Sequence, residues 1–112
     1  MLIKVVFAIV LVAHGLIHLM GAAKAFGLAD LPALTQPISR PMGLAWLLAS
    51  AMVLASAAAL FAWPRGWIFV AVLAAIVSQA VILTAWADAR FGTLANVLLL
   101  AGATAAWLSP GP

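Results

Sequence analysis

The chain has no cysteine, and charged residues make up only 6% of its 112 positions. Without cysteine it can form no disulfide, no thiol redox centre and no cysteine-ligated iron–sulfur cluster within itself. Soluble domains carry about 25% charged residues, whereas this chain is 69% hydrophobic. A fold with so little charge could not cover its surface in water. The composition therefore predicts an integral membrane protein, which we expect to be a multi-pass protein of the cell (inner) membrane.

Basic residues are also few, and they do not cluster along the chain. The five cations are Lys4, Lys24, Arg40, Arg65 and Arg90. A nucleic-acid-binding surface requires a basic patch, and this spacing forms none. Each cation instead lies near an end of a predicted helix, where lysine and arginine set topology and contact lipid headgroups. The two sides of the membrane receive similar numbers of cations, so this pattern predicts no orientation.

Four long apolar segments predict an all-α, four-transmembrane-helix bundle that forms a single domain over residues 1–112. The expected helices span about 2–26, 41–63, 66–87 and 91–108. The first apolar run is about 20 residues long, which exceeds the usual 7–15 residues of a secretory signal, so we interpret it as a membrane span. Five tryptophans fall near the expected helix ends and are predicted to be interface anchors: Trp46, Trp63, Trp67, Trp86 and Trp107.

The only two histidines, His14 and His18, lie four residues apart inside the first span. This spacing places them on one helix face, together with small residues that indicate contact with other helices. An ionisable residue at membrane depth is a functional-site hypothesis by default. With about 1.5 Å rise per residue, Gln79 and Asn96 fall at the same depth as the histidines. We therefore predict a shallow ligand-binding cavity formed by His14, His18, Gln79 and Asn96.

Charged residues are predicted to form a rim above this polar layer. They are Lys24, Arg40, Asp88 and Arg90, with Asp30 in the adjoining loop. In a purely structural interpretation, Asp88 is the N-cap of the last helix or pairs with Lys24 or Arg40. The intramembrane polar residues then only cross-link helices, through pairs such as His18–Asn96 and His14–Gln79 or His14–Ser50.

A metal or haem site is not favoured by the sequence. Two histidines at this spacing can chelate one ion, but Gly15 follows the first histidine where an H-E-x-x-H motif has glutamate. The chain has no glutamate or cysteine, and Asp88 is about 10 Å too shallow to be a third ligand. Two histidines on one helix face also cannot take opposite axial positions of one haem. We therefore predict no metal ligands.

The segment from His14 to Gly27 resembles the first helix of DoxX-like membrane proteins, small four-helix proteins. Gly15, Gly21 and Lys24 stand where those proteins tend to carry two glycines and a lysine. The longer first loop and the sequence Pro41-Met42-Gly43 before the second helix are also similar. The resemblance implies an accessory membrane subunit or a protein with a quinone or lipid site, not an enzyme on its own.

Three functional hypotheses follow. The first is an accessory or binding subunit that holds a lipid-like or quinone-like ligand in one half of the bundle. The second is a proton-coupled, small multidrug-type transporter that works as a dimer with His14 at the interface. The third is a structural membrane subunit with no ligand. The expected partners are the lipid bilayer and a homo-oligomer or larger membrane complex, and nucleic acid is not among them.

Overall fold

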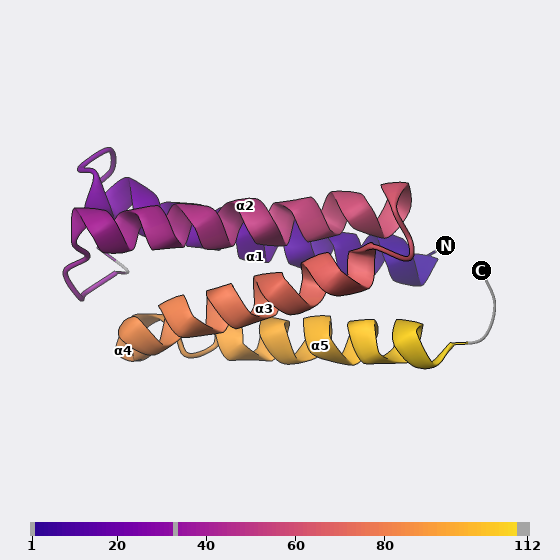
Figure 1. Cartoon of the computed structure of the whole chain (residues 1–112). Coiled ribbons are helices and arrows are strands. Elements are labelled where there is room, and N and C mark those ends of the chain that lie inside the picture. Colours follow the sequence, from indigo (N-terminus) through magenta and orange to yellow (C-terminus); the bar gives the residue numbers. More distant parts are fainter. Residues whose placement is uncertain (1, 33, 110–112) are drawn as a thin grey trace.

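The computed structural model describes residues 2–32 and 34–109. Within these ranges all regular secondary structure is helical (Figure 1). The helices are α1 (Leu2–Ala25), α2 (Arg40–Ala62), α3 (Trp67–Thr84), α4 (Trp86–Ala89) and α5 (Gly92–Leu108). The long helices run side by side, and both ends of the described chain lie at the same end of the bundle.

Local sequence explains how α1 ends and α2 begins. Gly27 has a positive φ of 69°, which glycine adopts without steric cost. The Gly27 and Leu28 amides donate back to the Lys24 and Ala23 carbonyls at 3.1 and 2.9 Å, which is the Schellman arrangement. At the start of α2 the Ser39 hydroxyl accepts from the backbone amide of Met42. The helix therefore begins at Arg40, next to its predicted start at about residue 41.

The third predicted helix ends earlier than expected. It was expected to reach residue 87, but α3 stops at Thr84, and Ala85 leaves the helical region with φ −134° and ψ 43°. The Ala85 amide donates to the Ile82 carbonyl at 3.0 Å, so the last turn of α3 is tighter than an α-helical turn. The chain then forms the short helix α4 before α5 begins at Gly92.

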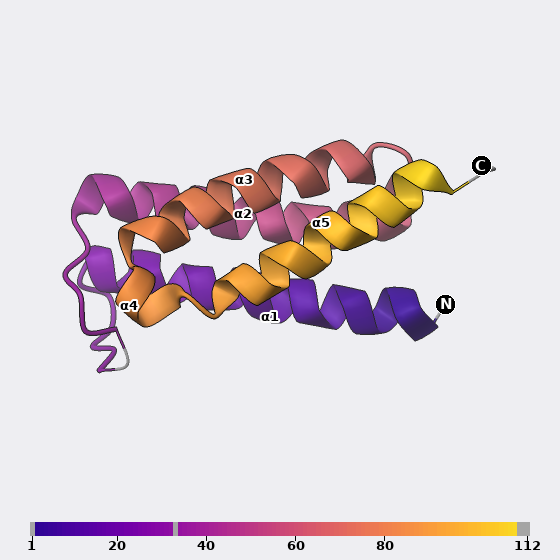
Figure 2. The same cartoon turned by 90° about the horizontal axis from the view of Figure 1, so that it is seen from below.

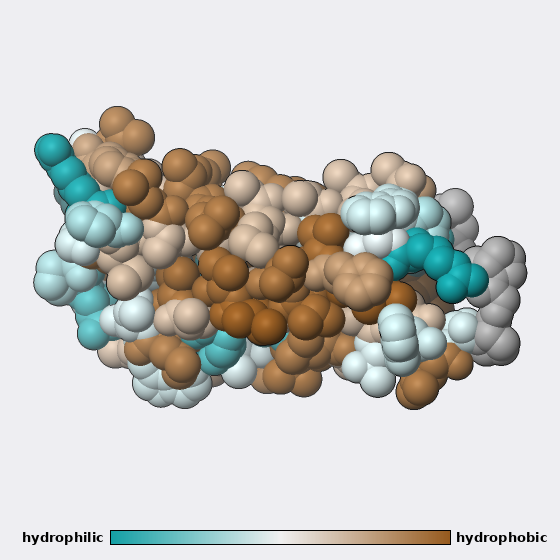
Figure 3. Space-filling view, in the orientation of Figure 1, coloured by the Kyte–Doolittle hydropathy of each residue, from teal (hydrophilic) through white to brown (hydrophobic). Residues whose placement is uncertain are grey.

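The surface of the bundle is strongly apolar. The helices α1, α2 and α3 are long and apolar enough to cross a membrane. The remaining long helix, α5, has 17 residues. At the usual rise its length is about 25 Å, somewhat less than the thickness of a hydrocarbon core, which is about 30 Å. Figure 3 shows a brown apolar belt around the middle of the visible face, with paler and teal residues toward both ends. Such a large exposed apolar surface is not expected of a soluble monomer.

Helices that follow one another in sequence pack against each other, α1 on α2, α2 on α3 and α3 on α5, while α1 and α5 touch much less. Figure 2 shows α1 and α5 diverging toward the end that carries the termini. Two apolar clusters fill the interior. One includes Leu11, Val53, Trp67 and Leu99, and the other includes Ala22, Trp46, Ala49 and Val81.

Candidate functional site

A buried polar layer lies along the helices between these two apolar clusters. Its members are exposed by 5% or less: His14, His18, Ser50, Ser78 and Asn96. On α1 the buried face also includes Gly15, Gly21 and Ala22, so the prediction that the histidine face points into the bundle is confirmed. Polar groups inside an apolar bundle must find partners in one another.

The two histidines converge on one serine hydroxyl. The Ser78 Oγ lies 2.8 Å from His18 Nε2 and 3.1 Å from His14 Nε2. The His14 Nε2 also lies 3.1 Å from the Asn96 Oδ1. The two imidazole rings are close as well, with centroids 4.5 Å apart and an edge-to-face orientation. Three helices, α1, α3 and α5, are thereby joined by side-chain hydrogen bonds.

This network continues outward from Asn96. The Asn96 Nδ2 donates to the Gln79 Oε1 at 3.0 Å, and the Gln79 Nε2 donates to the Thr93 Oγ1 at 3.1 Å. Because the Asn96 amide nitrogen faces Gln79, the amide oxygen of Asn96 faces His14 and accepts a hydrogen bond from it. The His14 Nε2 therefore carries the hydrogen, an assignment made from the network.

The same logic assigns the hydrogen of His18. With His14 donating, the Ser78 hydroxyl can direct its own hydrogen to the His18 Nε2, and we assign the His18 Nε2 as the acceptor. A neutral imidazole then carries its hydrogen on the other ring nitrogen, so the donor of His18 is Nδ1–H. That nitrogen is buried and makes no hydrogen bond of good geometry with the described residues, although the His14 and Ser78 backbones lie close enough to the His18 ring for weaker contacts.

The structure brings the four predicted site residues together but changes their pairing. Asn96 bonds to His14 and not to His18, and Gln79 reaches the histidines only through Asn96. Ser50 bonds to the Gly15 carbonyl at 2.7 Å and to neither histidine. The predicted pairs His18–Asn96, His14–Gln79 and His14–Ser50 are therefore wrong, because the rotation of each helix decides which neighbours at one depth can touch.

Ser78, the residue that joins the histidines, is absent from the sequence-based site. A sequence signal existed, because Ser78 shares the helical period of Ala71, Ala74 and Ala75, which are all buried on α3. A serine in line with small residues on a transmembrane helix indicates a close interhelical contact. The sequence-based site included the neighbouring Gln79 instead. The Gln79 side chain is rotated from that of Ser78 by about 100° around the helix.

A pocket of about 470 Å³ lies between α1 and the α4–α5 region, beside the histidines. Its wall includes both histidines, Trp46 and Asp88, and otherwise consists of apolar or small residues: Ile9, Val10, Ala13, Ile17, Met20, Leu34, Ile82, Ala89, Phe91, Gly92 and Ala95. Asn96 and Gln79 are not part of this wall.

Trp46, predicted to be an interface anchor, is only 2% exposed. Its ring centroid lies 5.3 Å from that of His18.

Trp67 is likewise a core residue, at 3% exposure, so the anchor prediction is wrong for both tryptophans. Trp63, Trp86 and Trp107 are exposed. The difference arises from helix rotation, because tryptophan near a helix end can face either lipid or the bundle.

Two residues of the predicted rim, Lys24 and Asp88, bind the loop between α1 and α2 through hydrogen bonds. The Lys24 ammonium donates to the Leu34 and Gln36 carbonyls. The Asp88 carboxylate accepts from the Thr35 hydroxyl at 2.5 Å and the Gln36 amide at 2.8 Å. The N-cap position of α5 is Phe91, with no side-chain cap. The predicted role of Asp88 as that N-cap is therefore wrong.

In the described part of the chain, Asp88 holds the loop and does not form the predicted ion pair with Lys24 or Arg40. Arg90 lies over the Phe91 ring at 5.1 Å. Arg40 is exposed at the first turn of α2. Leu34, on the held loop, lies in the wall of the histidine pocket, so these loop contacts fix one end of the pocket.

Protonation of Asp88 is expected to release this loop. The hydrogen bonds from Thr35 and from the Gln36 amide hold the pKa of Asp88 below its ordinary value. The contact therefore stabilises the loop above the pKa of the free carboxyl, and it is lost as pH falls through the lower folded pKa, at acidic pH. The protection factor of the Gln36 amide against hydrogen exchange, corrected for intrinsic rates, should fall several-fold as pH is lowered from 7 to 3.

The variant Asp88→Asn provides the control for this experiment. It removes the charge but keeps the size of the side chain, so its Gln36 protection should be low at both pH values and should not depend on pH. Equal pH dependence in the wild type and the variant would show that Asp88 does not hold the loop.

Among the described residues no three histidine, aspartate or glutamate side chains lie close enough to hold a metal ion. The arrangement offers a buried imidazole pair beside an apolar pocket, and one ring nitrogen, His18 Nδ1, makes no hydrogen bond of good geometry with the described residues. No family model, no curated protein and no solved structure matches the chain.

Proposed function

We propose that this protein is an integral membrane protein with four membrane-crossing helices, and that it binds a lipid-like molecule with a carbonyl-bearing head, such as a quinone, in the histidine pocket. The observation that carries this proposal is a pair of buried nitrogens in the residues of one wall. Among the described residues, His18 Nδ1 and Trp46 Nε1 make no hydrogen bond of good geometry, and both residues line the pocket. A buried donor without an acceptor costs about 1–3 kcal/mol.

The chemistry of the pocket selects the class of ligand. Both Trp46 Nε1 and His18 Nδ1 are donors in the assigned tautomer, so a carbonyl oxygen of the ligand satisfies them after a small local adjustment. The remaining wall is almost entirely apolar, which suits a hydrocarbon tail. A volume of about 470 Å³ lies within the range of about 300–1,000 Å³ that is typical of small-molecule sites.

The pocket is also placed for access from lipid. Three residues of its wall, Ile9, Ile17 and Phe91, are 57–71% exposed. They belong to the apolar outer surface that the proposed membrane placement turns toward the bilayer. A lipid-soluble ligand can therefore enter laterally between α1 and the α4–α5 region, where these residues line the pocket.

An accessory subunit is the role that best suits this site. Among the described residues the buried polar layer contains no carboxylate, and Asp88, the one carboxylate in the pocket wall, is bonded to Thr35 and Gln36 of the loop. The resemblance to DoxX-like proteins supports a binding or accessory role. The transporter alternative receives less support, because His14 lies inside the bundle and is bonded to Ser78 and Asn96. A dimer interface would need it on an outer face.

Ligand-induced stabilisation tests the proposal. The full chain in nanodiscs is titrated with decylubiquinone, and thermal unfolding is followed. The wild type should show a saturable rise in melting temperature, and native mass spectrometry should show the quinone retained. Trp46→Phe keeps the ring but removes the donor, and should weaken binding about tenfold. Ala13→Phe places a ring in the pocket from a surface position and should abolish binding.

Ser56→Ala is the matched control, because Ser56 is buried at a distance from the pocket and bonds within its own helix. It should bind the quinone like the wild type. An absence of saturable stabilisation in the wild type, or undiminished binding by Ala13→Phe, would overturn the proposed site.

A further inference from the structure

We infer that the histidine pocket orients its ligand along α1, with the polar head at the end beside α4 and one apolar tail against Ile9, Val10 and Ala13. This inference rests on the proposed function, and it adds the direction in which the ligand lies and the residues that contact its tail. On α1 the wall of the pocket extends from Ile9 to Met20, which corresponds to about 16 Å at the usual rise per residue. The wall is therefore long enough for its two ends to differ in chemistry.

The end of the pocket beside α4 carries polar side chains. His18 lies in the second half of α1, Trp46 in the first two turns of α2 and Asp88 in α4. The ring centroids of His18 and Trp46 are 5.3 Å apart. The carboxylate of Asp88 accepts hydrogen bonds from Thr35 and Gln36 of the loop. Because burial of a polar group is costly unless it forms hydrogen bonds, the head of an amphiphilic ligand is best placed here, beside His18 and Trp46.

The other end of the pocket is apolar. Ile9, Val10 and Ala13 line it from the part of α1 that precedes His14, and Ile9 and Ala13 are exposed on the outer surface. His14, the polar residue that follows them, is already bonded within the polar layer. A polar head at this end would be buried among hydrocarbon without a hydrogen-bond partner, whereas a hydrocarbon tail carries no such cost.

The loop between α1 and α2 closes the polar end of the pocket. Leu34 of this loop lies in the wall, and the hydrogen bonds of Asp88 hold the loop in place. At the apolar end the outer surface of α1 continues, because Val5 and Val6 lie one helical turn before Ile9 and are exposed. A tail longer than the pocket can therefore extend past Ile9 along α1, whereas a long substituent at the polar end would meet the loop.

Photolabelling from the end of the tail tests this orientation. The probe is a decylubiquinone analogue with a diazirine on the last carbon of its tail. It is irradiated with the full chain in nanodiscs, with and without an excess of decylubiquinone, and labelled peptides are identified by mass spectrometry. Only label that the excess quinone removes is assigned to the site. This competed label should be about tenfold more abundant on α1 before His14 than on the loop and α4, which corresponds to about 1.4 kcal/mol in favour of one orientation.

The position of the label separates the orientation from the proposed function. Competed label concentrated on the loop or on α4 would overturn the orientation and leave quinone binding intact, and equal label at the two ends would overturn it as well. The absence of competed label from the whole chain would overturn the proposed function and this inference together.

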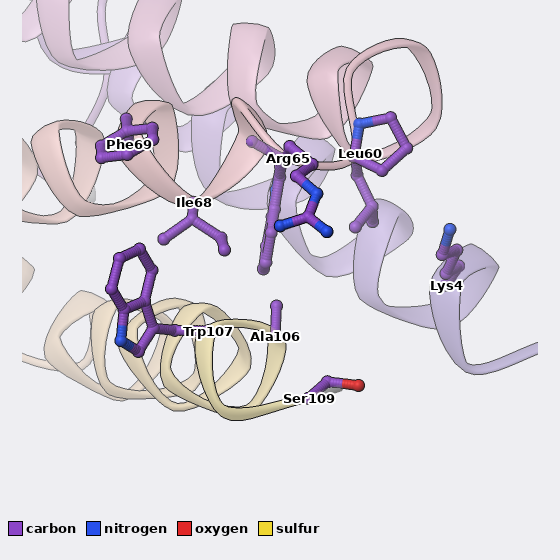
Figure 4. Close-up of a pocket in the computed structure, with 10 residues that line it drawn as sticks. Lys4, Leu60, Arg65, Ile68, Phe69, Ala106, Trp107 and Ser109 are labelled. Carbon is purple, nitrogen blue, oxygen red and sulfur yellow. The ribbon is translucent and has the colours of Figure 1, made fainter. Parts of the chain in front are cut away.

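A larger side chain at Val10 tests the tail contact separately. Val10→Phe should weaken the binding of decylubiquinone about tenfold, because the added ring takes space from the tail. Ser109→Phe is the matched control. It adds the same ring to the wall of a different pocket, of about 640 Å³, at the end of the bundle that carries the termini (Figure 4), and it should bind the quinone like the wild type. Undiminished binding by Val10→Phe, or an equal loss in Ser109→Phe, would overturn the assignment of the tail to Val10.

Discussion

Replacement of Ser78 by alanine is expected to lower the free energy of unfolding by about 1–2 kcal/mol. The variant loses the hydrogen bonds between α3 and both histidines. Measured interhelical hydrogen bonds in membrane proteins average about 0.6 kcal/mol each, which gives about 1 kcal/mol for two. The His18 Nε2 is then left buried without a donor, and the cost of an unpaired group adds to the loss.

Ser56 offers a control with the same chemistry and the same burial. Both serines are 0% exposed, but the Ser56 hydroxyl donates to the Val53 carbonyl of its own helix at 2.6 Å. Ser56→Ala therefore removes no bond between helices, and its free energy of unfolding should change by less than about 0.5 kcal/mol. Unfolding by SDS in mixed micelles measures both values. Equal losses at the two positions would mean that the histidine–serine network contributes nothing specific to stability.

Replacement of Gly21 by alanine is expected to cost about 1–3 kcal/mol, a typical cost of overpacking a closely packed site. A Cβ on Gly21 would lie 2.3 Å from the Cδ2 and Cε3 atoms of Trp46. The indole ring cannot bend away, and it is held beside His18 in the pocket wall. The variant must therefore move α1 from α2 or displace Trp46, so quinone binding should weaken together with stability.

A double variant separates this clash from a general intolerance of Gly21. Phenylalanine at position 46 is smaller than tryptophan, so Gly21→Ala combined with Trp46→Phe should cost less than the sum of the single changes. Ala51→Val, on the exposed face of α2, adds volume without a neighbour and should leave stability nearly unchanged. Strictly additive losses in the double variant would show that Trp46 is not the group that Gly21 accommodates.

Much of the site was accessible from the sequence because depth along a helix follows from counting residues. The rise per residue placed His14, His18, Gln79 and Asn96 in one layer, and the structure joins three of them directly, His14 to Asn96 and Asn96 to Gln79. The buried histidine face of α1 was predictable for a similar reason, since small residues continue it toward Gly21 and Ala22.

The partners within that layer could not be predicted, because periodicity does not give the rotation of one helix relative to another. A shift of one residue turns a side chain by about 100°, which separates Ser78 at the centre of the network from Gln79 at its edge. The burial of Trp46 and Trp67 was not predicted either, because it also depends on the rotation of their helices. The end of α3 at Thr84 depended on the path of the chain into α4, where Ala85 leaves the helical region.

The sequence by itself determined the all-helical fold, the apolar character of the long helices and the position of the two histidines along the first helix, because hydrophobicity and helix rise depend only on residue order. The tertiary structure decided that Ser78 joins those histidines, that Asp88 and Lys24 hold the first loop, and that a pocket lies between α1 and α5. Each of these depends on which faces of distant helices meet, and that is settled by the packing of the whole chain.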